Sequence, residues 1–211
     1  MKSIRVYLSG SIQKGSADVV KKSVWTSVDI CVLHEVLDGV VNLSLLNPTS
    51  RSDDLSDYQS VFGRDLLQVY ISDLVLVDAR DRKGIGIGAE MLFANMCGIP
   101  VVSVSPQNSQ YRKENLEYIG QFISNWIHPF IGGLSDHVAD SVYDAAIFIR
   151  DNYPFNEGFT KNKDDFLSMM QYYIATQLER DVEMYNLAVQ DHELMDRIER
   201  VRKGNWNKGA K

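Results

Sequence analysis

The chain has 211 residues, 45% of them hydrophobic, and a formal net charge of -6. This length can bury a sizeable core and corresponds to one domain, or to one domain with an appendage. The acidic balance argues against a nucleic-acid binder held by phosphate contacts, whereas local backbone amides can still hold a small anionic ligand.

Cysteine usage and hydropathy bear on the compartment of the protein. Cys31 and Cys97 stand in apolar contexts without CxxC spacing, which predicts buried thiols in a reducing compartment. We see no apolar leader segment and no apolar run as long as a membrane span. A cytoplasmic protein that does not bind membranes is therefore expected.

Strands and helices alternate along most of the chain. Apolar periodicity, caps and breakers predict strands at 4–8, 40–46, 74–77 and 99–104, and helices at about 16–37, 58–72, 90–97, 115–126 and 142–151. A short segment at 137–140 precedes the last of these helices. This alternation predicts an α/β fold, a doubly wound parallel sheet of Rossmann-like type with a strand order close to that of flavodoxin.

Composition changes at 152–158, which we interpret as a linker. Beyond it, residues 163–203 combine helix-forming residues with apolar positions at helical but irregular spacing. The sequence therefore predicts an α/β domain at 1–153 and a helical extension at 154–211. The extension is expected to form a helical hairpin that packs on its own domain or on another subunit.

A glycine-rich stretch follows the most apolar predicted strand, 74–77. Glycine occupies alternate positions from Gly84 through Gly86 to Gly88, and it lets backbone approach a ligand closely. A helix expected to begin at Glu90 would then project this carboxylate from its first turn. The carboxyl ends of parallel strands are where open α/β sheets bind ligands, so Glu90 is predicted to face a pocket.

Two further elements should bring polar groups to the same edge of the sheet. The helix before the third strand carries Asp65, and the first strand and its following turn carry the set Tyr7, Ser9, Gly10 and Ser11. Retaining chemistry at an anomeric carbon requires at least two carboxylates that face one pocket. A tyrosine hydroxyl beside the nucleophile can orient it by hydrogen bonding.

Four motifs in this order resemble the nucleoside 2-deoxyribosyltransferases and the related deoxynucleoside 5′-monophosphate N-glycosidases. They are Val6-Tyr7-Leu8-Ser9-Gly10-Ser11-Ile12, Arg64-Asp65-Leu66 ahead of Ser72-Asp73-Leu74-Val75, Gly86-Ile87-Gly88-Ala89-Glu90, and Gly98-Ile99-Pro100-Val101-Val102. The resemblance spans about residues 4–106. The chain departs from the family pattern at two places. Leu92 stands two residues after Glu90, where the family usually has glycine, and Gln13 and Lys14 stand where the monophosphate N-glycosidases tend to carry a basic, glycine-rich turn.

The resemblance implies an enzyme that cleaves the N-glycosidic bond of a 2′-deoxynucleoside or its 5′-monophosphate. It implies Glu90 as the nucleophile, Asp65 as the group that moves protons or binds the sugar, and Tyr7 as the residue that orients Glu90. The residues expected to line the substrate pocket are Ser9, Gly10, Ser11, Gly86 and Gly88. Asp78 is a candidate contact to a base or hydroxyl, or a turn cap. No metal or redox cofactor is implied.

Several alternatives stay open at this stage. Deoxyribose could pass to a second base, as in a transferase, or to water, as in a hydrolase. A different class of protein is a non-catalytic nucleotide-binding sensor module that signals through its C-terminal helices. The apolar side chains of 163–203 predict a homo-oligomer, most simply a dimer, whose neighbouring subunit completes the active site.

Overall fold

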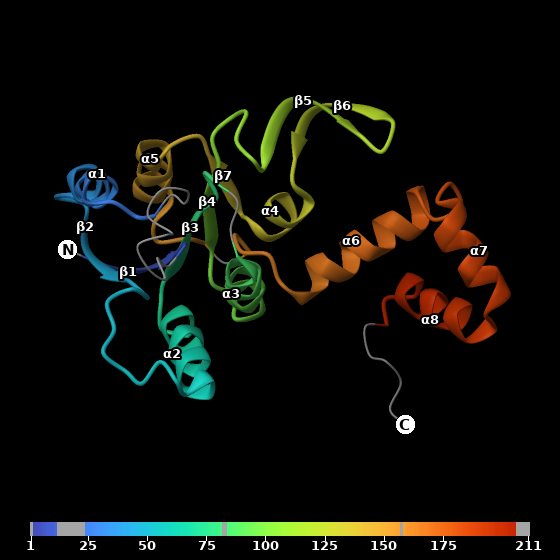
Figure 1. Cartoon of the computed structure of the whole chain (residues 1–211), viewed down its shortest axis with the longest axis horizontal. Coiled ribbons are helices and arrows are strands. Elements are labelled where there is room, and N and C mark those ends of the chain that lie inside the picture. The colour runs from blue at the N-terminus through green and yellow to red at the C-terminus, as the bar shows by residue number, and fades with distance from the viewer. Residues whose placement is uncertain (1, 12–23, 82–83, 157, 206–211) are drawn as a thin grey trace. The chain divides into compact units, whose positions relative to one another are not determined.

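The computed structural model of the chain describes residues 2–11, 24–81, 84–156 and 158–205 (Figure 1). Lys14 and the first part of the helix predicted at 16–37 lie outside these ranges. The main sheet consists of β1 (Lys2–Ser9), β2 (Val41–Leu46), β3 (Leu74–Asp78), β4 (Val101–Val104) and β7 (His137–Ala139). All neighbours pair in parallel, in the order β2-β1-β3-β4-β7. The predicted doubly wound α/β fold with flavodoxin-like order is confirmed.

Helices cover both faces of this sheet, as Figure 1 shows. On one face α1 (Ser27–Leu37) packs against α5 (Val142–Asn152), and on the other α2 (Tyr58–Tyr70) packs against α3 (Ile85–Met96). Side chains alternate between the faces of a strand. Leu8 of β1 therefore joins the core beneath α1 and α5, whereas Tyr7 and Ser9 point to the side of α3.

The first helix begins later than its apolar spacing predicts. Thr26 accepts a hydrogen bond from the Asp29 amide at 3.1 Å, and the Asp29 carboxylate accepts one from the Thr26 amide at 2.9 Å. This reciprocal capping box satisfies two amides that a helix terminus would leave without partners, so it fixes the start at Ser27. Residues 24–26 are not helical, so the prediction of a helix from about residue 16 is wrong for these residues. The rest of the predicted start, 16–23, lies outside the described residues.

The glycine-rich stretch is helical. Helix α3 begins at Ile85, so Gly86 and Gly88 belong to its first turns and Glu90 lies in the second turn. The prediction that the helix begins at Glu90 is wrong. Neither Gly86 nor Gly88 has a φ in the left-handed region, and both continue the backbone as ordinary helical residues.

The segment predicted as a helix at 115–126 is instead an antiparallel hairpin of β5 (Arg112–Tyr118) and β6 (Gln121–Ile127). A two-residue turn joins the strands, with φ of 50° at Ile119 and 71° at Gly120. Positive φ at both central residues is the geometry that matches the twist of paired strands. The unpredicted short helix α4 (Pro129–Leu134) follows, with proline at its first position.

The two cysteines are less buried than their apolar sequence contexts predict. Helix α1 faces the core through Leu33 and Leu37, which are four residues apart and share one face of the helix. Cys31 lies two residues before Leu33, on the outer side, and is exposed. Cys97 ends α3 and is half-buried. The prediction of two buried thiols is therefore wrong.

A second compact unit begins at Asn162, further along the chain than the expected boundary at 153. Over residues 162–205 it contains three helices rather than a helical hairpin: α6 (Lys163–Thr176), α7 (Val182–Gln190) and α8 (His192–Arg202). Asp181 and Asp191 cap α7 and α8 with their carboxylates, so the chain breaks into separate helices there. None of the helices in the described ranges is long and apolar enough to span a membrane.

Candidate active site

Glu90 is held by two hydroxyl groups from β1. The Tyr7 hydroxyl donates to Glu90 Oε1 at 3.0 Å, and the Ser9 hydroxyl donates to Glu90 Oε2. Tyr7 and Ser9 are two residues apart on a strand, so both side chains lie on the same face, and both are fully buried. Each carboxylate oxygen of Glu90 thus has its own donor, which fixes the rotation of the carboxylate.

The surroundings of Glu90 have opposing effects on its pKa. Burial raises its pKa, the hydrogen bonds from Ser9 and Tyr7 lower it, and the negative charge of Asp65 raises it again. The net result is a pKa above the ordinary value. Burial and the adjacent Glu90 also raise the pKa of Tyr7, which therefore stays a hydrogen-bond donor at neutral pH.

Asp65 comes to the same place from α2. Its charge acts on both Glu90 and Tyr7, so the structure brings together the three residues that the sequence singled out as catalytic. Its carboxylate Oδ1 lies 3.3 Å from Arg51 Nη1 and 3.5 Å from Arg64 Nη1. Burial raises the pKa of Asp65, and the two guanidinium groups oppose that rise.

These groups lie where the strand order reverses. β1 connects outward to β2 on one side and pairs with β3 on the other, and open α/β sheets bind ligands in the crevice beyond the carboxyl ends of such strands. Ser9 is the last residue of β1, and Glu90 stands on the helix that follows β3. The carboxylates of Glu90 and Asp65 therefore lie at the edge of the sheet that suits a ligand.

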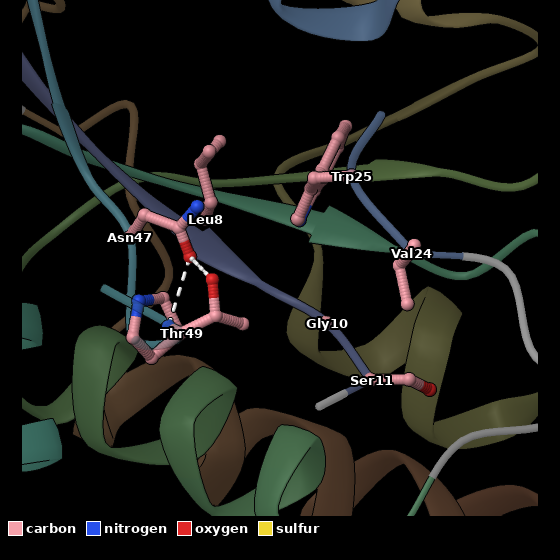
Figure 2. A pocket seen from close by; sticks show the side chains of 8 residues that line it. Leu8, Gly10, Ser11, Val24, Trp25, Asn47 and Thr49 are labelled. Atoms are coloured by element: carbon pink, nitrogen blue, oxygen red, sulfur yellow. Dashed lines mark hydrogen bonds between the residues drawn. The ribbon is translucent and has the colours of Figure 1, made fainter. Parts of the chain in front are cut away.

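A cavity of about 320 Å³ opens at the carboxyl ends of β1 and β2 (Figure 2). It is lined by Leu8, Gly10, Ser11, Val24, Trp25, Asn47, Pro48 and Thr49. Gly10 directly follows Ser9, the hydrogen-bond partner of Glu90, but Ser9, Asp65 and Glu90 are not among the residues that line the cavity. Small-molecule sites are about 300–1,000 Å³ in volume, mostly apolar with a few polar groups. This cavity has that size, and its lining is about as polar as it is apolar.

Glycine is favoured by packing at Gly10, whereas the described residues place no such constraint on Gly86 and Gly88. A Cβ at Gly10 would lie 3.0 Å from Trp25 Nε1, a tighter approach than most Cβ atoms make, so the Trp25 side chain would have to shift. A Cβ at Gly86 or Gly88 would meet no other atom of the described residues within 4 Å. Packing within the described chain therefore does not explain these two helical glycines, whereas the approach of a ligand to the helix would.

Asp78 has a different environment. Its buried carboxylate pairs with Arg80, with Nε and Oδ1 2.9 Å apart. Arg80 Nη1 also binds Asp29 Oδ1 at 3.0 Å, and the guanidinium lies 5.5 Å from the centre of the Trp25 ring. Asp78 thus belongs to an ion-pair cluster with Arg80 and Asp29, and the Arg80 guanidinium of this cluster lies over the Trp25 ring. Among the described residues, no group of three or more His, Cys, Asp or Glu side chains is arranged to hold a metal ion.

Several residues of this region were missed in the sequence. Trp25, Asn47 and Thr49 line the cavity, and Arg51 and Arg64 hold Asp65. One signal was available, because Asn47 directly follows β2, the strand beside β1, and so had to reach the same edge of the sheet. Arg51 lies in the polar loop before α2, where spacing gives no indication of its partner.

Comparisons with known proteins give only distant likenesses. No protein-family profile matches the chain, and no curated protein matches it. A solved 2-deoxyribosyltransferase from Bacillus psychrosaccharolyticus is 16% identical with a TM-score of 0.46, covering 75% of this chain and 97% of its own. The NAD(P)H:(acceptor) oxidoreductase FerB from Paracoccus denitrificans is 21% identical with a TM-score of 0.29, covering 50% of this chain and 61% of its own. The first bears the name of the family that the sequence motifs resemble.

Proposed function

We propose that the protein cleaves the N-glycosidic bond of a 2′-deoxynucleoside or its 5′-monophosphate with retention at the anomeric carbon. The observation that carries this proposal is the carboxylate of Glu90, held by two buried hydroxyl donors beside a second carboxylate, Asp65. Retaining glycoside chemistry needs one carboxylate as nucleophile and another group to move a proton. Hydrogen bonds to both oxygens keep Glu90 oriented for attack.

The proposed reaction has two steps. In the first, a Glu90 oxygen attacks C1′, the C1′–N bond breaks, and its electron pair leaves with the base nitrogen, to which protonated Asp65 gives its proton. In the second, water or the nitrogen of another base attacks C1′. Asp65 takes the proton from the attacking group, and the Glu90 carboxylate is released. The raised pKa of Asp65 supports a group that carries this proton.

The cavity at the carboxyl ends of β1 and β2 supplies the substrate site in this proposal. Ser11 and Asn47 offer polar groups at its wall, and Trp25 and Leu8 offer apolar surface. The Asn47 side-chain oxygen accepts from Thr49, both from its amide at 2.9 Å and from its hydroxyl at 2.7 Å. Gly86 and Gly88 leave the start of α3 open to the sugar or phosphate of the substrate. Asp78 contributes by holding Arg80 behind Trp25 rather than by touching substrate.

The proposal is tested by incubating the protein with a panel of deoxynucleosides and their monophosphates and measuring free base by chromatography. The wild-type protein should release base from at least one member of the panel, and Glu90→Ala should abolish the release. Glu35→Ala, at an exposed position on α1, serves as the control and should keep full activity. Ligand-induced thermal stabilisation without base release across the panel would favour a non-catalytic sensor instead.

Transfer and hydrolysis are separated by a second assay. A labelled acceptor base is added together with the substrate that the panel identifies. Labelled nucleoside appears if a second base takes the deoxyribose, and only free sugar appears if water does. Either result is compatible with the Glu90 intermediate, because both begin with the same cleavage.

A further inference from the structure

Asp65 and three other charged side chains form a closed ring of ion pairs. Arg51 uses Nε and Nη2 to bind both carboxylate oxygens of Asp53, with Nε and Oδ1 2.8 Å apart, and its Nη1 lies 3.3 Å from Asp65 Oδ1. Arg64 closes the ring, since its Nη1 lies 3.5 Å from Asp65 Oδ1 and its Nε 3.8 Å from Asp53 Oδ1. Positive and negative groups alternate around the ring, so no like charges are direct neighbours in it.

Arg51 is the most buried member of the ring. Its side chain is 9% exposed, against 20–24% for Asp53, Arg64 and Asp65. A buried guanidinium is retained only where its donors have partners, and the two carboxylates provide them. An arginine fork can serve two carboxylates at once in a fixed plane, whereas a lysine ammonium acts as a single point charge.

The loop that carries Arg51 and Asp53 also forms part of the wall of the cavity. Asn47, Pro48 and Thr49 line the cavity just ahead of Arg51. Arg64 of α2 also donates to this loop, to the Ser50 carbonyl oxygen at 2.8 Å and to the Pro48 carbonyl oxygen at 3.4 Å. The segment 47–53 is therefore joined at one end to the cavity wall and at the other, through the ring, to Asp65.

We propose that Arg51 is a positioning residue, which fixes the Asp65 carboxylate relative to Glu90 and ties it to the loop that lines the cavity. The proposal rests on the proposed function, since it concerns the second carboxylate of the same site. A substrate that presses on Asn47–Thr49 would move Arg51 and, with it, Asp65. The reaction would thereby depend on the fit of the bound molecule to the loop as well as to the carboxylates.

The other three charged groups of the ring act on the pKa of Asp65. Arg51 and Arg64 favour the ionised form, whereas burial and the nearby Asp53 favour the protonated form. Glu90 from α3 and Tyr7 from β1 lie close enough for the charge of Asp65 to act on them. Removing the charge of Arg51 therefore raises the pKa of Asp65, because one of the two groups that oppose the effect of burial is lost.

The test compares Arg51→Gln and Arg51→Lys with the control Arg5→Gln. Arg5 lies on the same strand as Tyr7 and takes no part in the site. It makes a bidentate ion pair with Asp73, in which both contacts are 2.9 Å long. Carbon-13 NMR follows the titration of the Asp65 carboxyl group, assigned by its absence in Asp65→Asn. We expect Arg51→Gln to move the Asp65 midpoint upward, Arg51→Lys to move it less, and the control to leave it unchanged.

Kinetics distinguish positioning from charge alone. Both Arg51 variants should lower kcat by about tenfold or more, since a small misplacement of a reacting group has that effect. The limb of the pH–rate profile that belongs to Asp65 should move in the same direction as the NMR midpoint. If Arg51→Gln fails to fold, Arg51→Lys, which keeps the charge and the aliphatic stem, decides the question by the same two measurements.

An active wild-type protein whose Arg51 variants match the Arg5→Gln control in kcat and in the Asp65 midpoint overturns the positioning role and leaves the proposed function intact. Full activity in Arg51→Lys with an upward midpoint in Arg51→Gln also overturns it, because a point charge would then suffice. A wild-type protein that releases no base from any substrate overturns the proposed function, and the positioning role with it.

Discussion

The two hydroxyl groups on Glu90 differ in kind, because Tyr7 is a rigid phenol and Ser9 a short side chain that can rotate. Both hydrogen bonds lower the pKa of the Glu90 carboxylate, whereas burial raises it. Burial keeps the nucleophile poorly hydrated, while the two hydrogen bonds favour its ionised form. This balance leads to two predictions about single residues.

The first prediction concerns the acid limb of the pH–rate profile for base release. Activity should rise with pH as Glu90 loses its proton, with a midpoint above 4.5, the ordinary value for a glutamate. Tyr7→Phe and Ser9→Ala each remove one hydrogen bond that favours the ionised form, so each should move this limb to higher pH. A limb that stays in place in both variants would show that these hydroxyls do not act on the nucleophile.

The second prediction concerns stability. Because the pKa of Glu90 in the folded state lies above its value in the unfolded chain, folding favours the protonated form. Below pH 4.5 both states hold the proton, and the wild-type protein loses stability as pH rises from there through the folded pKa. Glu90→Gln should therefore be more stable than wild type by about 1 kcal/mol at pH 7.

Urea denaturation at pH 4 and pH 7 measures this difference. The two proteins should have nearly equal free energies of unfolding at pH 4 and diverge at pH 7. Glu35→Gln, at an exposed position on α1, controls for the loss of a negative charge. An equal gain in both glutamine variants would attribute the effect to net charge rather than to the burial of Glu90.

Sequence patterns predicted the carboxylate cluster because its members belong to regular strands and helices whose order along the chain is visible in the sequence. Strand alternation puts Tyr7 and Ser9 on one face, and the order of strands brings α3 to that face. Arg51 could not be predicted in the same way. Its two partners are two and fourteen residues away, and only the path of the loop decides that its guanidinium reaches both.

At the scale of elements, the hairpin shows where periodicity fails. Leu116, Ile119, Ile123 and Trp126 recur at intervals of three and four residues, which is helical spacing. The structure instead has paired strands, because Ile119 and Gly120 adopt positive φ and reverse the chain. Turn geometry of this kind outweighs periodicity in a short segment, and the isoleucine at the turn gives no hint of it.

The third prediction follows from that turn. Ile119 is branched at Cβ, 83% exposed, and has a φ of 50°, a conformation that costs such residues on the order of 1 kcal/mol or more. Asparagine followed by glycine is favoured in this turn type. Ile119→Asn should stabilise the hairpin by about 1 kcal/mol, visible as slower amide hydrogen exchange across 112–127. Ile123→Asn, within a strand, is the control, and equal protection in both variants would contradict the turn argument.

At the scale of the whole molecule, the C-terminal unit carries an apolar groove of about 420 Å³. It is lined by Met169, Met170, Tyr173, Ile174, Leu178, Met184, Arg197, Ile198 and Val201. Apolar positions at helical spacing in the sequence predicted helices with an apolar side here. They could not predict three helices, because the breaks depend on the capping carboxylates of Asp181 and Asp191.

The fourth prediction concerns assembly. We expect the full chain to form a homo-oligomer, most simply a dimer, in which this groove is covered, because an exposed apolar groove marks an interaction surface. Met170→Glu, in the groove, should weaken the oligomer, whereas Tyr172→Glu, exposed and outside the groove, should not. Light scattering at micromolar concentration measures the mass, and a monomeric wild-type chain would refute the prediction.

The central claim is that Glu90 forms a covalent bond to C1′ of the sugar. The most direct measurement is mass spectrometry of the protein quenched in acid during turnover of a substrate from the panel, followed by proteolysis. We predict a peptide containing Glu90 that is heavier by one deoxyribosyl group, with or without its phosphate, and no such peptide in Glu90→Gln. Base release at full rate with the adduct on another residue, or an active Glu90→Gln variant, would contradict the account.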